Sequence, residues 1–429
     1  MKNRQDRPFM KTQDEIARQP GYFIQLSLLS LITATILLFF SVPLTANELQ
    51  LSAEEKLEDF EHLYEVLENN YMYFEVNRRL NDIDWLSNYD DYRAAVLETE
   101  DDKEFYQVIQ EIIKDLRQGH SNVLWYEYYD YYVQAFSQAA EAVDSIYQAW
   151  VEELTKEQVT ERKDFWLDIQ KGRNPQDAAE AEEDVGDKPR ESNIFFHKYP
   201  ESDIALIGFK TFRHEYMETD RDSLLSIYSE LDNYRKLIID IQGNSGGSTR
   251  YWSELIVPLI SPEEYKAEFL IAFRNSDFVE RFFPQNFRSA TDSLPDLPEL
   301  PPELYEWDVL FDTLVMSTDP DSTYIDFKGD IYLLVDQYVY SASEAFALFS
   351  RYSGFATVAG TVTGGDGIGR DPVIFSLPNS GLVIQFPVFM GLNPDGSANE
   401  EKNTVPDILL DGETSEERRG QLIEILEAV

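Results

Sequence analysis

Ser341 is the residue whose setting in the sequence best suits covalent chemistry. It opens Ser341-Ala-Ser-Glu344, which follows the apolar run 331–335 and begins a helical pattern. A serine where a strand turns into a helix presents its hydroxyl beside backbone N–H groups that have no partner within the helix. Such groups can hold the oxyanion of acyl transfer, so the setting suits a nucleophile. Ser-x-x-Glu is also a capping box, and this stretch alone favours a cap.

Two other stretches contain groups that could complete such a site. His120 follows Gly119, which we expect to end an amphipathic helix, and a lone histidine on a turn is more often structural than catalytic. The apolar strand 236–241 runs into Gln242-Gly-Asn-Ser-Gly-Gly247, where adjacent glycines let the backbone point N–H groups at a ligand. This loop lacks the spacing and the lysine of phosphate-binding loops. It is therefore a candidate oxyanion hole or a plain turn.

Composition excludes several classes of function. The formal charge of -44 leaves no basic surplus for binding nucleic acid. The absence of cysteine excludes disulfides, thiolate catalysis and zinc–thiolate sites. Hydrophobic residues make up 43% of the chain, which is enough for a packed core. We expect no cofactor and no metal, and the sequence makes no prediction of oligomeric state.

The N-terminus has the pattern of a targeting segment. Residues 1–19 carry a small basic surplus, and residues 22–44 are apolar and uncharged. This run is long enough to span a bilayer, and its basic flank predicts that the remainder is exported. The alternative is a signal peptide cleaved near Ala46, after which the protein would be secreted. We favour an uncleaved anchor in the cell membrane with an extracytoplasmic catalytic domain.

The remaining chain divides into three predicted parts after the tail and anchor of residues 1–46. Residues 52–120 form a helical subdomain that begins with the capping box Ser52-Ala-Glu-Glu55 and ends at the histidine. Residues 121–200 are an insertion with helical patterning and an acidic, low-complexity segment at 174–192. Its tyrosines 126–132 could line a peptide groove, although ordinary packing is favoured.

Residues 201–429 form the third predicted part, which has the pattern of an α/β core. Strands are expected at 204–208, 236–241, 331–335 and 356–359, and helices at 223–231, 252–259 and from 415. A hairpin is expected to turn at 379–381. The stretch 261–329 is expected to be irregular, because a proline-rich string at 294–302 marks a surface loop.

Taken together, the motifs resemble those of the C-terminal processing (tail-specific) and tricorn-like serine peptidases. The resemblance extends from Ser52 to the end of the chain, except for 121–200 and 261–329. It rests on six segments in the same order as in that family: Leu116-Arg-Gln-Gly-His-Ser121, Ile207-Gly-Phe209, Asp240-Ile-Gln-Gly-Asn-Ser-Gly-Gly247, Ser341-Ala-Ser-Glu344, Thr363-Gly-Gly365 and Asn403-Thr-Val-Pro-Asp407. It implies an α/β fold with a crotonase/ClpP-like core sheet, an N-terminal helical subdomain and a helical insertion.

The chain departs from the tail-specific branch at one position. Asp366, in Gly365-Asp-Gly367, stands where that branch has its lysine base, and no PDZ module is recognisable. The tricorn-like branch uses a histidine instead. The resemblance therefore implies His120 as the general base, with Glu400 (or Glu401) holding its tautomer, while Asp366 shapes the loop or meets a substrate amine.

The resemblance implies an extracytoplasmic serine peptidase that cleaves polypeptides or their C-terminal peptide bonds. Ser341 would be the nucleophile, and the N–H groups of Gly246 or Gly247 and of Ala342 would hold the oxyanion. A polypeptide substrate and the membrane are then the expected partners. The alternative is a catalytically inactive peptide-binding scaffold of the same fold.

Overall fold

The apolar strand around residue 238 lies inside a six-stranded sheet in the computed structural model, which describes residues 50–142, 147–172 and 192–428. The strand order is β12-β8-β7-β4-β3-β2, and all neighbours are parallel except β2 and β3. The strands are β2 (Ile194–Tyr199), β3 (Ile204–Phe209), β4 (Lys236–Asp240), β7 (Asp330–Val335), β8 (Thr357–Gly360) and β12 (Ile408–Leu409). The four strands predicted by their apolar runs are confirmed.

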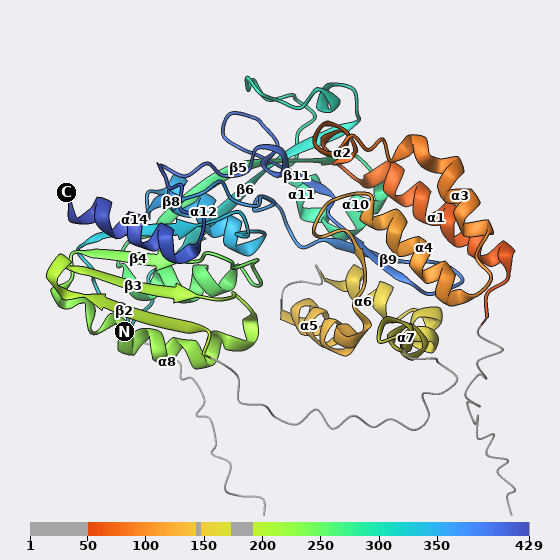
Figure 1. Cartoon of the computed structure of the whole chain (residues 1–429). Helices are drawn as coiled ribbons and strands as arrows, with labels where there is room; N and C mark the ends of the chain where they lie inside the picture. The colour runs from red at the N-terminus through yellow and green to blue at the C-terminus, as the bar shows by residue number, and fades with distance from the viewer. Residues whose placement is uncertain (1–49, 143–146, 173–191, 429) are drawn as a thin grey trace, which may run out of the picture. The chain divides into compact units, whose positions relative to one another are not determined.

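The central strands β3 and β4 are buried on both faces, which explains why their apolar sequences are uninterrupted. Alternate residues of β3 and β4, such as Leu206 and Ile238, pack with Leu422 and Leu426 of the C-terminal helix α14 (Ser415–Glu427). The other face contacts the main core, to which α8 (Met217–Tyr228) and α12 (Ala342–Ser353) contribute. Figure 1 shows α14 and α8 on opposite sides of β2, β3 and β4.

The predicted helical subdomain is present. It begins with the capping box at Ser52, as predicted, and its apolar side chains stack on one another around Trp85. Its elements are α1 (Ala53–Asn70), α2 (Phe74–Asn81), η1 (Leu86–Asn88), α3 (Tyr89–Leu97) and α4 (Asp102–Lys114).

The helical patterning predicted within residues 121–200 is confirmed by three helices. They are α5 (Tyr129–Ala142), α6 (Gln148–Leu154) and α7 (Glu157–Gln170), preceded by η2 (Tyr126–Tyr128). Helices α6 and α7 are joined to the predicted hairpin β9 (Val373–Ser376) and β10 (Val383–Phe386): Trp150 donates to the carbonyl of Pro372, and Trp166 donates to that of Ser380. Most of the acidic segment 174–192 lies outside the described residues.

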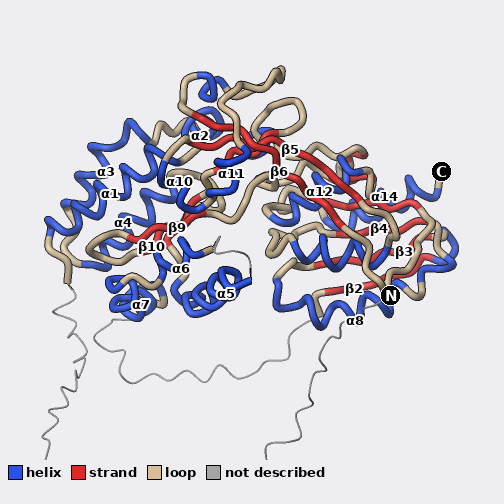
Figure 2. Tube along the Cα trace, turned by 180° about the vertical axis from the view of Figure 1, so that it is seen from behind, coloured by secondary structure: helices blue, strands red, loops and turns tan. Residues whose placement is uncertain are grey.

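The prediction of an irregular 261–329 stretch is wrong. Residues on both sides of the proline-rich string form the long strands β5 (Tyr265–Arg274) and β6 (Val309–Thr318), which pair antiparallel over ten residues (Figure 2). Strand β11 (Phe389–Leu392) joins the other edge of β5, so the order is β11-β5-β6. The chain that connects β5 to β6 forms the short helices α10 (Asp277–Phe282), α11 (Pro284–Ser289) and η8 (Pro302–Tyr305).

Short elements complete the described part of the chain. They are β1 (Asn122–Val123), η4 (Pro200–Ser202), η5 (His214–Tyr216), η6 (Leu231–Asn233), η7 (Tyr251–Ile256), α9 (Val257–Ile260) and α13 (Asn399–Lys402). Among the helices of the described ranges, none is long and apolar enough to cross a bilayer. The apolar segment 22–44 lies outside those ranges.

Candidate active site

Ser341 occupies a strained turn between β7 and α12. Its φ and ψ angles are 58° and -124°, a conformation that a residue with a Cβ adopts only when its surroundings impose it. The same kind of sharp strand-to-helix turn exposes the nucleophilic serine of other hydrolases. The Ser341 side chain makes no capping hydrogen bond. The capping interpretation of this residue is therefore wrong.

Glu344, the other half of the supposed capping box, faces the interior. It is fully buried, and its carboxylate accepts hydrogen bonds from Thr404 (2.6 Å) and Asn399 (3.2 Å). Burial raises the pKa of Glu344 above its usual value despite these donors. Glu344 therefore links α12 to the segment 399–404 and forms no capping box with Ser341.

His120 bridges Ser341 and Asp366. Its Nε2 lies 3.0 Å from Ser341 Oγ, and its Nδ1 lies 2.6 Å from Asp366 Oδ2. With Nδ1–H donating to Asp366, the free Nε2 lone pair can accept the serine proton. Burial lowers the pKa of His120, but the charge of Asp366, its hydrogen bond to the imidazole and the charge of Asp371 together outweigh burial, so the net shift is upward.

Asp366 is held by three donors from two segments, the 118–120 turn and the turn before Ser341. Besides His120, its Oδ2 accepts hydrogen bonds from Tyr340 Oη (2.9 Å) and from Gln118 Nε2. Burial raises the pKa of Asp366, but His120, Tyr340 and Gln118 together outweigh that effect and lower it. Burial and the nearby carboxylates raise the pKa of Tyr340 far above its usual range, so its hydroxyl stays a donor.

The turn that presents Asp366 depends on unusual backbone geometry. Asp366 has φ of 57° and Gly365 has φ of 90°. The Gly365 carbonyl accepts from the Ser341 N–H, and the Gly367 N–H donates to Asn399 Oδ1. The motif around Asn403 closes the other side, because Asn403 Nδ2 donates to the Thr363 carbonyl. The loop that carries the acid is thus tied directly to the nucleophile.

The prediction that Glu400 orients His120 is wrong, because Asp366 occupies His120 Nδ1. Glu400 Oε2 is buried and has no hydrogen-bond partner among the described residues. Burial raises the pKa of Glu400 well above its usual range, and the charges of Asp366 and Glu344 raise it further. The alternative, Glu401, pairs with Arg79. The sequence did contain one indication of this role, because Asp366 is an acid at the position where the tail-specific branch has its lysine base.

The glycine loop is fastened to the nucleophile helix by Asn244, which is fully buried. Its Oδ1 accepts from Ser343 Oγ (2.8 Å) and from the Gly246 N–H (3.0 Å). The Gly246 N–H is thus occupied, which corrects the prediction of Gly246 as an oxyanion donor. The N–H groups of Gly247 and Ala342 have no acceptor among the described residues, and both residues line the cavity beside Ser341.

Gly119 has a different role from the predicted helix stop. Helix α4 already ends at Lys114, with Asp115 as its C-cap. A Cβ at Gly119 would lie 2.8 Å from the hydroxyl oxygen of Tyr340. Glycine therefore allows the turn that carries His120 to pack against the tyrosine that holds Asp366. Gln118 and Tyr340 were not predicted, since nothing in their local sequence marks them.

A cavity of about 610 Å³ opens beside these groups. Its wall includes Ser341, His120 and Asp366, and its apolar side chains include Trp252, Phe283, Leu314, Met316 and Phe389. Of the insertion, Tyr147 lines it, whereas none of tyrosines 126–132 does. His214 is exposed and lies outside this wall.

Comparison with known proteins identifies the family. Residues 203–410 match Peptidase family S41, and residues 52–114 match the Tricorn protease C1 domain. The chain carries a peptidase family S41 domain at residues 203–410. It is accordingly a serine-type peptidase, of the tricorn-like and C-terminal processing kind that the motifs indicated. No match to a curated protein sequence was found.

Solved structures agree with this S41 fold. A peptidase from Parabacteroides merdae ATCC 43184 is 17% identical with a TM-score of 0.52, covering 86% of this chain and 96% of that one. Mature CPAF is 13% identical with a TM-score of 0.53, covering 87% and 96%. Mature CPAF complexed with lactacystin is likewise 13% identical with a TM-score of 0.52, covering 87% and 98%. These likenesses establish the mixed α/β fold.

Proposed function

We propose that this S41 peptidase hydrolyses polypeptides through a triad of Ser341, His120 and Asp366. The observation that carries the proposal is the continuous chain of contacts from Ser341 Oγ through the imidazole to Asp366 Oδ2. Each side chain comes from a different part of the chain, and Tyr340 and Gln118 also donate hydrogen bonds to Asp366. An inactive scaffold has no need for this alignment.

The mechanism follows from the geometry. Ser341 Oγ attacks the peptide carbonyl while His120 Nε2 takes its proton, and the imidazolium then protonates the leaving amine. Asp366 stabilises that imidazolium and keeps Nδ1 protonated. The N–H groups of Gly247 and Ala342 stabilise the oxyanion; removing one such donor typically slows acylation by about 100- to 1000-fold. Water then attacks the acyl-enzyme by the reverse sequence.

A fluorophosphonate probe tests this assignment, because it reacts only with an activated serine. We expect full-length protein to be labelled at Ser341, as mapped by mass spectrometry, and labelling to disappear in Ser341→Ala and His120→Ala. His214→Ala is the matched control and should be labelled like the wild type. Labelling that survives His120→Ala would exclude His120 as the base, and an unlabelled wild type would favour the binding scaffold.

We also propose that the peptidase domain is extracytoplasmic and anchored by residues 22–44. The support is the length of this uncharged run and its basic flank. Full-length protein should stay with membranes after an alkaline carbonate wash, and protease added to intact spheroplasts should digest its domain. Release of a shortened chain would indicate signal cleavage instead, and protection from the protease would contradict the proposed orientation.

A further inference from the structure

The outer edge of β6 is an unpaired strand beside the nucleophile. Phe311 exchanges two backbone hydrogen bonds with Thr291 on the side away from β5. Beyond that bridge, β6 forms the edge of its sheet in the described part of the chain. Residues 314–317 of this edge line the cavity that contains Ser341 and His120.

The pairing register shows which backbone groups face outward. In an antiparallel pair, alternate residues direct their N–H and C=O groups to opposite sides of the strand. The N–H and C=O groups of Phe311 point away from β5. Those of Thr313, Val315 and Ser317, at every second residue, therefore point the same way. The Thr313 N–H is taken by Asp312 Oδ1. The N–H and C=O groups of Val315 and Ser317 have no partner among the described residues.

This edge also lacks the features that protect sheet edges from pairing. Exposed edge strands usually carry lysine, proline or a bulge that blocks the approach of another strand. Here the outward-facing positions are Thr313, Val315 and Ser317, all uncharged, and the Val315 side chain is 48% exposed. The edge is thus uncharged although the chain as a whole has a formal charge of -44. An open edge of this kind can accept an added strand.

We propose that a polypeptide substrate docks in extended conformation on the edge of β6, with backbone hydrogen bonds to Val315 and Ser317. Its alternate side chains then face the cavity wall, whose apolar residues include Leu314, Met316 and Trp252. This docking rests on the proposed peptidase function and specifies how the same site holds its substrate. Backbone recognition makes binding depend on an extended segment more than on one side chain.

Proline substitutions test the edge while keeping the backbone hydrogen bonds to β5. Val315→Pro and Ser317→Pro each remove one outward N–H, while the ladder to β5 uses the intervening residues. Thr313→Pro is the matched control, because its N–H is already occupied and it lies outside the cavity wall. The assay measures cleavage of unfolded fluorescent casein and, separately, fluorophosphonate labelling of Ser341, which needs no docked strand.

Docking on β6 predicts that casein cleavage falls about tenfold in Val315→Pro and Ser317→Pro, while labelling of Ser341 stays intact. Cleavage by Thr313→Pro should stay near that of the wild type. Equal cleavage by all variants would overturn docking on β6 and leave the serine mechanism standing. Loss of labelling in the wild type would instead overturn the proposed function. A wild-type dimer that Val315→Pro separates would show that a second copy covers the edge, which also overturns the proposal.

Modified substrates test the same edge with the unaltered protein, in case proline disturbs folding. Cleavage sites mapped in casein are resynthesised as short peptides with a single N-methyl group on successive backbone nitrogens. Docking as a strand predicts that kcat/KM falls about tenfold at every second position and changes little between. Indifference to N-methylation away from the scissile bond would overturn the proposal.

Discussion

At the scale of single residues, the assignment of Asp366 rather than Glu400 can be tested by two neutralising substitutions of similar size. Asp366→Asn removes the acceptor that sets the His120 tautomer, and we expect kcat to fall about ten-thousandfold. Glu400→Gln removes no hydrogen bond to another described residue, and we expect kcat to stay within about threefold. Steady-state kinetics on a peptide substrate decides between them. A larger fall in kcat for Glu400→Gln than for Asp366→Asn would restore Glu400 as the acid that orients His120.

The pH dependence of activity should report the same contact. Since Asp366 raises the pKa of His120 above its usual value of about 6.5, neutral His120 predominates only above that raised value. The acidic limb of kcat/KM should therefore lie above pH 6.5 and move to lower pH in the residual activity of Asp366→Asn.

Tyr340→Phe is the control for this shift. It removes a hydrogen bond to Asp366 but keeps the negative charge beside His120. We expect kcat to fall about tenfold with KM little changed, while the acidic limb stays above pH 6.5. A limb that moves as far in Tyr340→Phe as in Asp366→Asn would show that the charge of Asp366 does not set the pKa of His120.

At the scale of elements, the glycine loop after β4 should be sensitive to substitution at one glycine and tolerant at another. Gly247 has φ of 137°, and an added Cβ would lie 2.4 Å from the carbonyl carbon of Phe212. Gly243 has φ of 77° but nothing within 4 Å of an added Cβ. We expect Gly243→Ala to cost about 1 kcal/mol of unfolding free energy and Gly247→Ala about 3 kcal/mol or more.

Urea denaturation and peptide hydrolysis measure the two glycine effects separately. Gly247→Ala should also lose activity, because relief of the clash displaces an oxyanion donor, whereas Gly243→Ala should retain most of it. Equal stability and equal activity of the two variants would contradict the close packing of the loop on Phe212.

The elements that could be predicted are those whose burial determines their own residue pattern. β4 and β7 are buried on both faces, so their apolar runs are uninterrupted and recognisable. β5 and β6 mix buried and exposed positions along their length, and the turn-forming prolines at 294–302 between them suggested a loop. Likewise, the choice between Asp366 and Glu400 depends on which loop reaches His120. That is a tertiary distance, which no local pattern contains.

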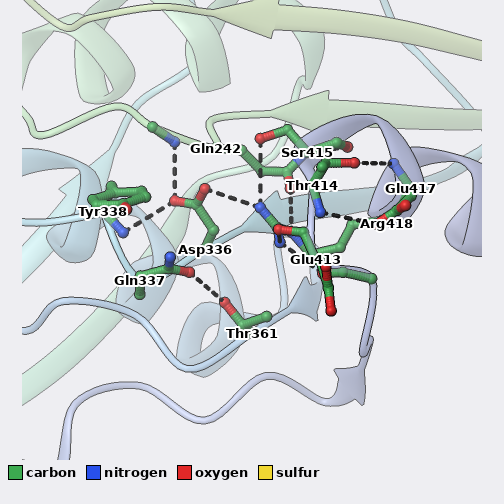
Figure 3. A network of polar contacts seen from close by, with 12 residues as sticks. Gln242, Asp336, Gln337, Tyr338, Thr361, Glu413, Thr414, Ser415, Glu417 and Arg418 are labelled. Atoms are coloured by element: carbon green, nitrogen blue, oxygen red, sulfur yellow. Dashed lines mark hydrogen bonds and ion pairs between the residues drawn. The ribbon is translucent and has the colours of Figure 1, made fainter.

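At the scale of the whole catalytic domain, the C-terminal helix holds together the loops that carry the site. Asp336 follows β7 and accepts from the backbone N–H groups of Gly243 and Tyr338 (Figure 3). Its other oxygen lies 3.2 Å from Arg418 of α14, and Arg418 Nε also donates to Gln242. One buried ion pair therefore joins the oxyanion loop, the segment before Ser341 and the end of the chain.

Breaking this pair should destabilise the domain far more than breaking an exposed one. Arg418→Ala leaves Asp336 buried without its counter-charge, and both side chains are at most 5% exposed. We expect it to cost about 3–5 kcal/mol of unfolding free energy and to lower peptidase activity as the loops loosen. Lys328→Ala, which breaks an exposed pair with Asp326, is the control and should cost less than about 1 kcal/mol. Urea denaturation gives both values, and an Arg418→Ala cost as small as the control would mean that α14 covers the sheet without holding the site.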